Sequence, residues 1–145
     1  MIIGKYNILE EIGSGSFGLI YKAQNIYNNN KVALKIVSKK SILNYTILKH
    51  EAELYNYFKK NDLRYQLNLR GYNIHNELSY LVIDLLDISF YNWVELNYNR
   101  ISIYDINLIF NQLISSIYEI HSLDILHRDI KPCNIMIKKK RDYCM

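Results

Sequence analysis

The stretch Gly13-Ser14-Gly15-Ser16-Phe17-Gly18, followed by Leu19-Ile20-Tyr21-Lys22-Ala23, decides between two folds. Its glycines have the spacing GxGxxG, which occurs in loops that bind nucleotide phosphates and also in ordinary hairpin turns. A dinucleotide-binding fold requires a helix directly after the glycines, with its amino terminus at the pyrophosphate. Here residues 6–12 alternate polar and apolar side chains, and residues 18–24 resume an extended pattern. We therefore expect two strands joined by a tight glycine-rich turn, and the dinucleotide fold is excluded.

A lysine on the next predicted strand strengthens a phosphate-binding interpretation. Residues 32–37 form a short β-rich run that contains Val32-Ala33-Leu34-Lys35. Glycines let the backbone approach phosphate oxygens, and a lysine on the neighbouring strand would supply a cation for them. Because a lysine among apolar neighbours needs a counter-charge, we look for an acid nearby. Glu51 lies on the inner face of an amphipathic helix predicted over 46–59, and we place it ahead of Glu53, which falls off that face.

The remaining elements favour a two-part α+β fold. We expect further strands at about 67–73 and 78–84 and helices at about 89–97 and 103–122. Ser102 and Asp105 form a start like a capping box for the last helix. The order is five strands with one helix among them and then a mostly helical part, which differs from an alternating βαβ sheet.

The composition fits one globular domain and excludes several classes of protein. Half of the 145 residues are hydrophobic and 22% are charged, which is not the composition of a disordered chain. The net charge of +4 comes mostly from the terminal run Lys138–Arg141, which we interpret as a solvated turn and not as a nucleic-acid site. Cys133 and Cys144 lack the spacing of a zinc site or disulfide framework, so we expect a reducing, cytoplasmic compartment. We find neither a signal peptide nor an apolar run long enough for a membrane.

The stretch His127-Arg128-Asp129-Ile130-Lys131-Pro132-Cys133-Asn134 follows the last predicted helix. It resembles HRDxKxxN, the catalytic loop of eukaryotic-type protein kinases, and the resemblance covers the whole chain because GxGxxG and VALK precede it in the right order. The sequences of three segments are most similar to those of the casein kinase I group: Ile12–Gly18, Leu81–Leu86 and His127–Pro132. The resemblance implies a kinase-like α+β fold with a five-stranded antiparallel, ATP-binding N-lobe over 1–84. The hinge and a partial helical C-lobe would occupy 85–145.

The resemblance also implies roles in the catalytic loop. Asp129 would accept the proton of the substrate hydroxyl, Lys131 would stabilise the transferred phosphate, and Asn134 would bind a magnesium ion. The order Asp-x-Lys resembles serine/threonine kinases. We expect His127 to have a structural role under the loop.

ATP would contact the glycine-rich turn, the adjacent strands, the lysine–glutamate pair, the hinge and one residue after the catalytic loop. These residues are Ile12, Gly13, Ser14, Gly15, Ser16, Phe17, Gly18, Ile20, Ala33, Lys35, Glu51, Asp84, Leu86 and Met136. Ile20 and Ala33 would form the roof over adenine and Met136 the floor, with Ile83 as gatekeeper and Asp84, Leu85 and Leu86 as hinge. The apolar members could equally be ordinary core.

The sequence departs from the kinase pattern after Asn134. A kinase continues through a hairpin to Asp-Phe-Gly, whose Asp is the principal magnesium ligand. Asp142-Tyr143-Cys144 is a faint substitute that lacks the glycine and lies too close to Asn134. We therefore expect an incomplete magnesium site, a truncated domain and impaired transfer. The alternatives are a pseudokinase that binds nucleotide or partners, or a remnant of an interrupted gene. Helix 103–122 would expose an apolar face to a protein partner or be unstable.

Overall fold

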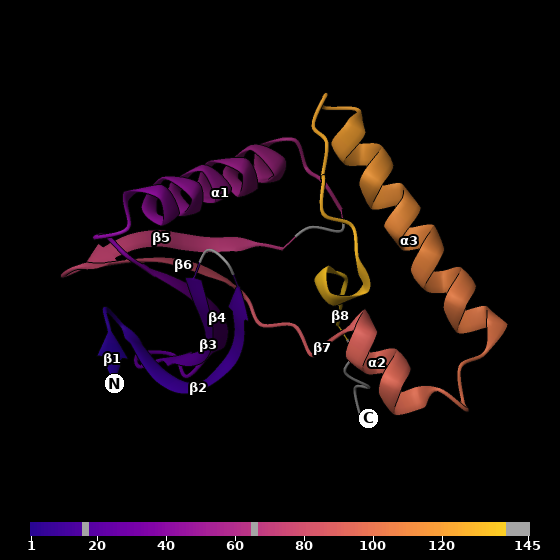
Figure 1. The fold of residues 1–145 in the computed structure, drawn as a ribbon, viewed down its shortest axis with the longest axis horizontal. Helices are drawn as coiled ribbons and strands as arrows, with labels where there is room; N and C mark the ends of the chain where they lie inside the picture. Colours follow the sequence, from indigo (N-terminus) through magenta and orange to yellow (C-terminus); the bar gives the residue numbers. More distant parts are fainter. Residues whose placement is uncertain (16–17, 65–66, 139–145) are drawn as a thin grey trace. The chain divides into compact units, whose positions relative to one another are not determined.

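The computed structural model describes residues 1–15, 18–64 and 67–138 of the chain. The chain divides into two compact units (Figure 1). The first comprises Met1–Asp62 and Gln66–Leu85, and the second comprises Leu63–Tyr65 and Leu86–Met145. The short segment after the first long helix thus belongs to the second unit, although the elements on either side of it belong to the first.

The first unit is an antiparallel sheet with one long helix (Figure 1). Its elements are β1 (Ile2–Ile3), β2 (Tyr6–Gly15), β3 (Gly18–Asn25), β4 (Lys31–Ser38), α1 (Ile42–Lys60), β5 (Leu69–His75) and β6 (Leu78–Asp84). The strand order is β1-β2-β3-β4-β6-β5. All five expected strands are present, and the two-residue β1, too short to show alternation, adds a sixth. The helix begins earlier than predicted, because Ile42 and Leu43 are exposed and lie outside the buried stripe that the periodicity detects.

Each face of this sheet carries its own apolar cluster, because side chains alternate along β4. Leu34 and Ile36 point to one face, and Ala33 and Val37 point to the other. The first cluster is completed by Ile3, Tyr6, Ala23, Val32, Tyr80 and Val82. The second, which includes α1, is completed by Leu48, Ala52, Leu81 and Ile83. Lys35 lies between Ala33 and Val37, so the alternation directs it to the face that α1 covers.

Within the described residues, the second unit contains two α-helices and a small sheet. Its elements are β7 (Ile88–Ser89), α2 (Phe90–Asn97), α3 (Ile103–His121), a 3-10 turn (Pro132–Asn134) and β8 (Met136–Ile137). The expected capping box is confirmed, since Ser102 and Asp105 exchange side-chain and backbone hydrogen bonds at the start of α3. The antiparallel β7–β8 pair was not predicted, because strands of two residues are too short for a periodic pattern.

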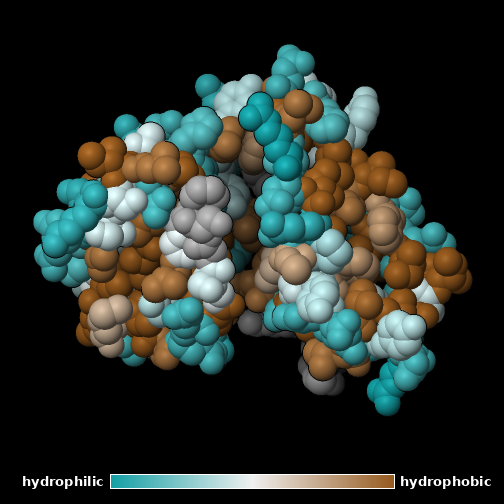
Figure 2. Space-filling view, in the orientation of Figure 1, coloured by the Kyte–Doolittle hydropathy of each residue, from teal (hydrophilic) through white to brown (hydrophobic). Residues whose placement is uncertain are grey.

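One face of α3 is apolar and solvent-exposed, as Figure 2 also shows over this helix. Ile103, Ile114 and Tyr118 are 76%, 61% and 74% exposed. Phe110, at the same helical phase, meets the edge of Phe90 with ring centroids 6.3 Å apart. The partner expected on this face stays a prediction. Among the described residues, every helix is too short or too polar to cross a membrane.

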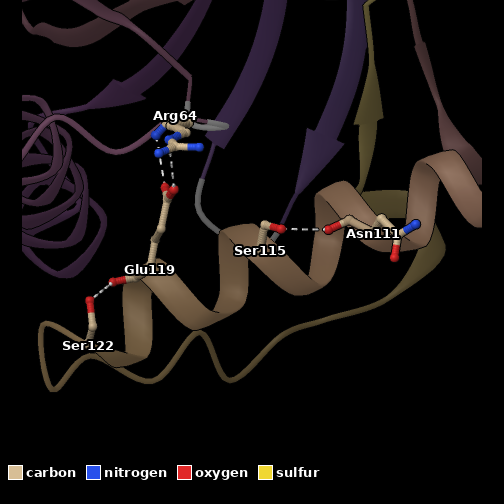
Figure 3. Close-up of polar contacts among 5 residues, drawn as sticks. All are labelled: Arg64, Asn111, Ser115, Glu119 and Ser122. Atoms are coloured by element: carbon tan, nitrogen blue, oxygen red, sulfur yellow. Dashed lines mark hydrogen bonds and ion pairs between the residues drawn. The ribbon is translucent and has the colours of Figure 1, made fainter.

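Polar contacts on α3 explain why the segment after α1 belongs to the second unit (Figure 3). The backbone N–H of Arg64 donates to Glu119 Oε2 at 2.9 Å, and Arg64 Nε lies 3.6 Å from Glu119 Oε1. Ser115 and Ser122 donate to the backbone carbonyls of Asn111 and Glu119. The Glu119 carboxylate thus holds Arg64 by two contacts, one with the Arg64 backbone N–H and one with the Arg64 side chain.

Candidate functional site

The lysine–glutamate pair predicted from the sequence is present in the first unit. Lys35 Nζ donates to Glu51 Oε2 at 2.5 Å, which joins β4 to α1. The two side chains are 19% and 25% exposed, so water screens the pair only partly. Glu53, the alternative partner, instead lies 3.8 Å from His50 on the exposed side of the helix. The helical phase of Glu51 therefore identified the correct partner.

Tyr55 lies one helical turn beyond Glu51 and reports on the surroundings of the pair. Burial, and after it the negative charge of Glu51, raise the pKa of Tyr55 far above the usual range. The phenol therefore stays protonated at any physiological pH. Lys35 and Glu51 thus sit beside a neutral, partly buried ring at the edge of the second apolar cluster.

The glycine-rich turn joins β2 to β3, with Gly13 opposite Ile20 and Gly15 opposite Gly18. A Cβ atom at Gly13 would meet nothing closer than Ile20 at 3.8 Å. Gly18 differs, because its φ is +142° and a Cβ atom would lie 2.6 Å from the Ile36 carbonyl oxygen. Gly18 is thus required by the packing of β3 on β4, whereas a Cβ atom at Gly13 would make only ordinary contacts with Ile20.

Four other residues of this turn were expected to contact ATP, and the structure describes two of them. Ile12 is the extra residue of a β-bulge and is exposed, and Ser14 pairs with Leu19. Ser16 and Phe17 lie outside the described residues.

Four of the apolar residues expected around adenine share one cluster in the first unit, and the expected floor residue Met136 is not among them. Ala33 is buried, and Ile20 and Leu85 pack against the same cluster as Ile83, on the α1 face of the sheet. This placement fits a core role, and the half-buried side chains of Ile20 and Leu85 could also offer an apolar surface to a flat ring.

Asp84, at the end of β6, has two polar partners that sequence reasoning missed. Arg70 Nε donates to Asp84 Oδ1 at 2.5 Å, and Asn68 Nδ2 donates to Asp84 Oδ2 at 2.9 Å. The sequence does carry a signal for Arg70. In Leu69-Arg70-Gly71-Tyr72, the apolar residues Leu69 and Tyr72 are three positions apart, whereas regular alternation would put them two or four apart. This odd spacing, with a glycine inside the strand, indicates a β-bulge.

The catalytic-loop residues come together in the second unit. Lys131 Nζ lies 3.0 Å from Asp129 Oδ1, and Asn134 Nδ2 donates to Asp129 Oδ2 at 2.7 Å and to the Asp129 carbonyl at 3.0 Å. The turn that carries Asn134 starts at Pro132, whose fixed φ suits the first position of such a turn. The backbone N–H of Asp129 donates to His127 Nδ1 at 3.3 Å, so the exposed His127 accepts a hydrogen bond from the loop backbone.

The hydrogen bond from Lys131, and after it that from Asn134, hold the pKa of Asp129 below its usual range. Asp129 is therefore ionised at neutral pH and accepts hydrogen bonds without being strongly basic. Such a carboxylate can orient a hydroxyl group and take its proton late, as the hydroxyl oxygen loses electrons to a new bond.

The last predicted contacts also lie in the second unit. Met136 is on β8, opposite Ser89, and is 42% exposed, and Leu86 is half-buried. Asp142-Tyr143-Cys144 lies outside the described residues. Within the described part of the chain, His, Cys, Asp and Glu side chains do not gather in groups of three that could hold a metal ion.

Two comparisons with known proteins agree with this arrangement. Residues 6–144 match the family model of the protein kinase domain. The crystal structure of a kinase domain resembles the chain with a TM-score of 0.86 at 23% sequence identity, a likeness that concerns the fold. That match covers 96% of this chain and 42% of the solved chain, so the present chain spans less than half of the kinase chain it resembles. The chain belongs to the protein kinase domain family.

Proposed function

We propose that this chain binds ATP at Lys35 and the glycine-rich turn, and that it transfers the γ-phosphate to a serine or threonine hydroxyl of a protein. Members of the protein kinase family use ATP and Mg²⁺ and act on protein substrates. The observation that carries the proposal is the 2.5 Å pair between Lys35 and Glu51. A lysine held in this way on an inner face of a sheet is a preorganised cation for phosphate oxygens.

The surroundings of Lys35 support this role. Glu51 fixes the direction of the lysine side chain, so little rotational freedom remains to be lost when an anion binds. Ile20 is opposite Lys35 in the sheet register and offers an apolar side chain beside it. Gly13, opposite Ile20, carries no side chain of its own that would keep a phosphate away from the backbone. A cation, an apolar surface and an open backbone are what a nucleotide needs.

The finer assignment to serine/threonine kinases, close to the casein kinase I group, is supported by the catalytic loop. Lys131, two residues after Asp129, lies 3.0 Å from its carboxylate. In the proposed reaction Asp129 accepts the hydroxyl proton while the hydroxyl oxygen bonds to the γ-phosphorus, and the bond from that phosphorus to the ADP oxygen breaks. Lys131 would offset the negative charge of the transferred group.

Magnesium would be held only in part by the described residues. Because Asn134 directs its amide nitrogen to Asp129, its carbonyl oxygen Oδ1 is the atom suited to a hard cation. When bound, the ion neutralises phosphate charge. One amide oxygen and one neighbouring carboxylate are few ligands for Mg²⁺. A second candidate function for the described part of the chain is that of a nucleotide-binding kinase relative with impaired transfer.

The first test is calorimetric titration of ATP into the full chain. Lys35→Ala should weaken ATP binding about tenfold or more, because a charge-assisted bond to phosphate is lost. Lys22→Ala is the matched control, since Lys22 is on the adjacent strand and also pairs with a glutamate at 2.5 Å. Equal affinity of the wild-type chain and Lys35→Ala would contradict the proposal.

Transfer of radiolabelled phosphate from ATP to casein separates the two candidate functions. Transfer by the wild-type chain that disappears in Asp129→Asn supports the active kinase. ATP binding without transfer, unchanged by Asp129→Asn, supports the impaired relative.

A further inference from the structure

Side-chain hydrogen bonds continue the pairing of β5 with β6 past the end of their backbone ladder. The last ladder pair at this end is Leu69 with Ile83, which leaves Asp84 one residue outside it. Both carboxylate oxygens of Asp84 are nevertheless bound by the residues that flank Leu69, Oδ1 by Arg70 and Oδ2 by Asn68. Asp84 also pairs with Val32 of β4 on its other side. The end of β6 is therefore fixed from both neighbouring strands.

A β-bulge aims Arg70 at Asp84. The register of β5 on β6 passes from Leu69–Ile83 to Gly71–Val82, so that Arg70 is the extra residue. Leu69 and Tyr72, three residues apart, both pack on the α1 face, which regular alternation would not allow. Because the bulge absorbs one residue, Arg70 is turned away from that face. Asp84 is on the same side as Tyr80 and Val82, since these positions alternate with Leu81 and Ile83.

The Arg70–Asp84 pair is asymmetric in its exposure. The Asp84 side chain is 12% exposed and that of Arg70 is 47% exposed. The carboxylate is thus largely withdrawn from water and depends on its protein partners, while the arginine reaches it from the surface. Loss of Arg70 would leave a nearly buried charge with fewer hydrogen bonds, and the chain at Asp84 would move to find water.

We propose that Arg70, together with Asn68, is a positioning residue for the backbone at Asp84 and Leu85, and that it thereby sets the affinity of the chain for the adenine part of its nucleotide. This inference rests on the proposed function and on the hinge expected at Asp84, Leu85 and Leu86, whose backbone would receive the edge of adenine. Leu85 follows Asp84 directly and packs on the same cluster as Ile20 and Ala33. A displacement of the Asp84 backbone would first move its neighbour Leu85. Lys35 would stay in place, because Glu51 holds it separately.

The adenine and phosphate parts of the site should therefore respond to different substitutions. Titrations of the full chain with ATP, adenosine and tripolyphosphate separate them. Arg70→Met should weaken ATP and adenosine by the same factor, about tenfold, the scale of one lost hydrogen bond to a charged group. Tripolyphosphate affinity should stay within about twofold, because additivity holds for independent parts of a site. Lys35→Ala should give the opposite pattern, with tripolyphosphate weakened and adenosine retained.

Two further measurements show whether Arg70 acts through Asp84. The double variant Arg70→Met with Asp84→Asn should bind adenosine no more weakly than Asp84→Asn alone. In the absence of nucleotide, amide hydrogen exchange at Leu85 should be faster in Arg70→Met than in the wild-type chain, and unchanged in Lys22→Met, which removes an ion pair elsewhere on the sheet.

Adenosine affinity equal to that of the wild-type chain, or an equal loss for tripolyphosphate, would overturn the inference. If the wild-type chain binds none of the three compounds, the proposed function fails, and exchange at Leu85 then tests the positioning role alone. Unchanged exchange in Arg70→Met would overturn that role as well.

Discussion

Two lysine–glutamate pairs on the same sheet have the same length and different surroundings. Lys22 on β3 meets Glu10 directly opposite on β2, and Lys35 on β4 meets Glu51 on α1, each at 2.5 Å. The first pair is 30% and 58% exposed and the second 19% and 25%. The first pair connects strands that the backbone ladder already joins, whereas the second connects a strand to a helix.

The comparison teaches that distance alone does not mark a functional pair. An exposed cross-strand pair in water contributes little to stability and is screened by salt. A partly buried pair holds its charges more strongly and orients them toward one place. The same contrast separates the two glycines, since a Cβ atom at Gly13 would make only ordinary contacts with Ile20, whereas Gly18 lies against the backbone of β4. We therefore regard β4 with α1 as the rigid side of the first unit.

The largest expected effect concerns these glycines. Gly18→Ala places a Cβ atom 2.6 Å from the Ile36 carbonyl oxygen at a φ of +142°, so one of the two strands must move. We expect a loss of about 3 kcal/mol of unfolding free energy. Gly13→Ala meets only ordinary contacts and should leave stability nearly unchanged. Urea unfolding of the two variants measures both, and equal destabilisation would remove the distinction between the two sides of β3.

The next largest expected effect on stability comes from removing the two glutamates, Glu51 and Glu10, one at a time. Glu51→Ala leaves the partly buried Lys35 ammonium without its carboxylate, and we expect a loss of about 2 kcal/mol of unfolding free energy. Glu10→Ala should leave the unfolding midpoint unchanged within error, because exposed pairs often contribute nothing measurable. Urea unfolding at low and at high salt checks this, and a larger loss for Glu10→Ala would reverse the comparison.

Much of this fold could be predicted because its signals are local. Alternation and β-rich runs predicted the five longer strands, and the three- and four-residue spacing predicted the two long helices and selected Glu51 over Glu53 as the partner of Lys35. The same rules could not find β1, β7 and β8, since two residues carry no period. They also misplaced the start of α1, where exposed Ile42 and Leu43 precede the buried stripe.

The sequence predicted a set of candidate site residues but only some of the contacts among them. The catalytic loop predicted Asp129, Lys131 and Asn134, and the side chains of Lys131 and Asn134 both lie within hydrogen-bonding distance of the Asp129 carboxylate. The partners of Asp84 were missed, because Arg70 reaches it only through a bulge that shifts the pairing of two strands. A bulge depends on both strands at once, so a pattern read along one strand does not reveal what its extra residue will contact.

The smallest expected effect is a change in the pKa of Glu10, which tests the exposed Lys22–Glu10 pair. The hydrogen bond from Lys22, and then its positive charge, hold the pKa of Glu10 below the ordinary value of 4.5. A lowered carboxyl pKa stabilises the folded state above the ordinary pKa, and this contribution disappears as pH falls through the lowered value. Lys22→Met should therefore return the pKa of Glu10 toward 4.5, as followed by NMR titration of its carboxyl carbon, while Lys35→Met should leave it unchanged. If Lys35→Met moved the Glu10 titration as much as Lys22→Met, the two pairs would be coupled across the sheet, and the contrast between its exposed and rigid sides would not hold.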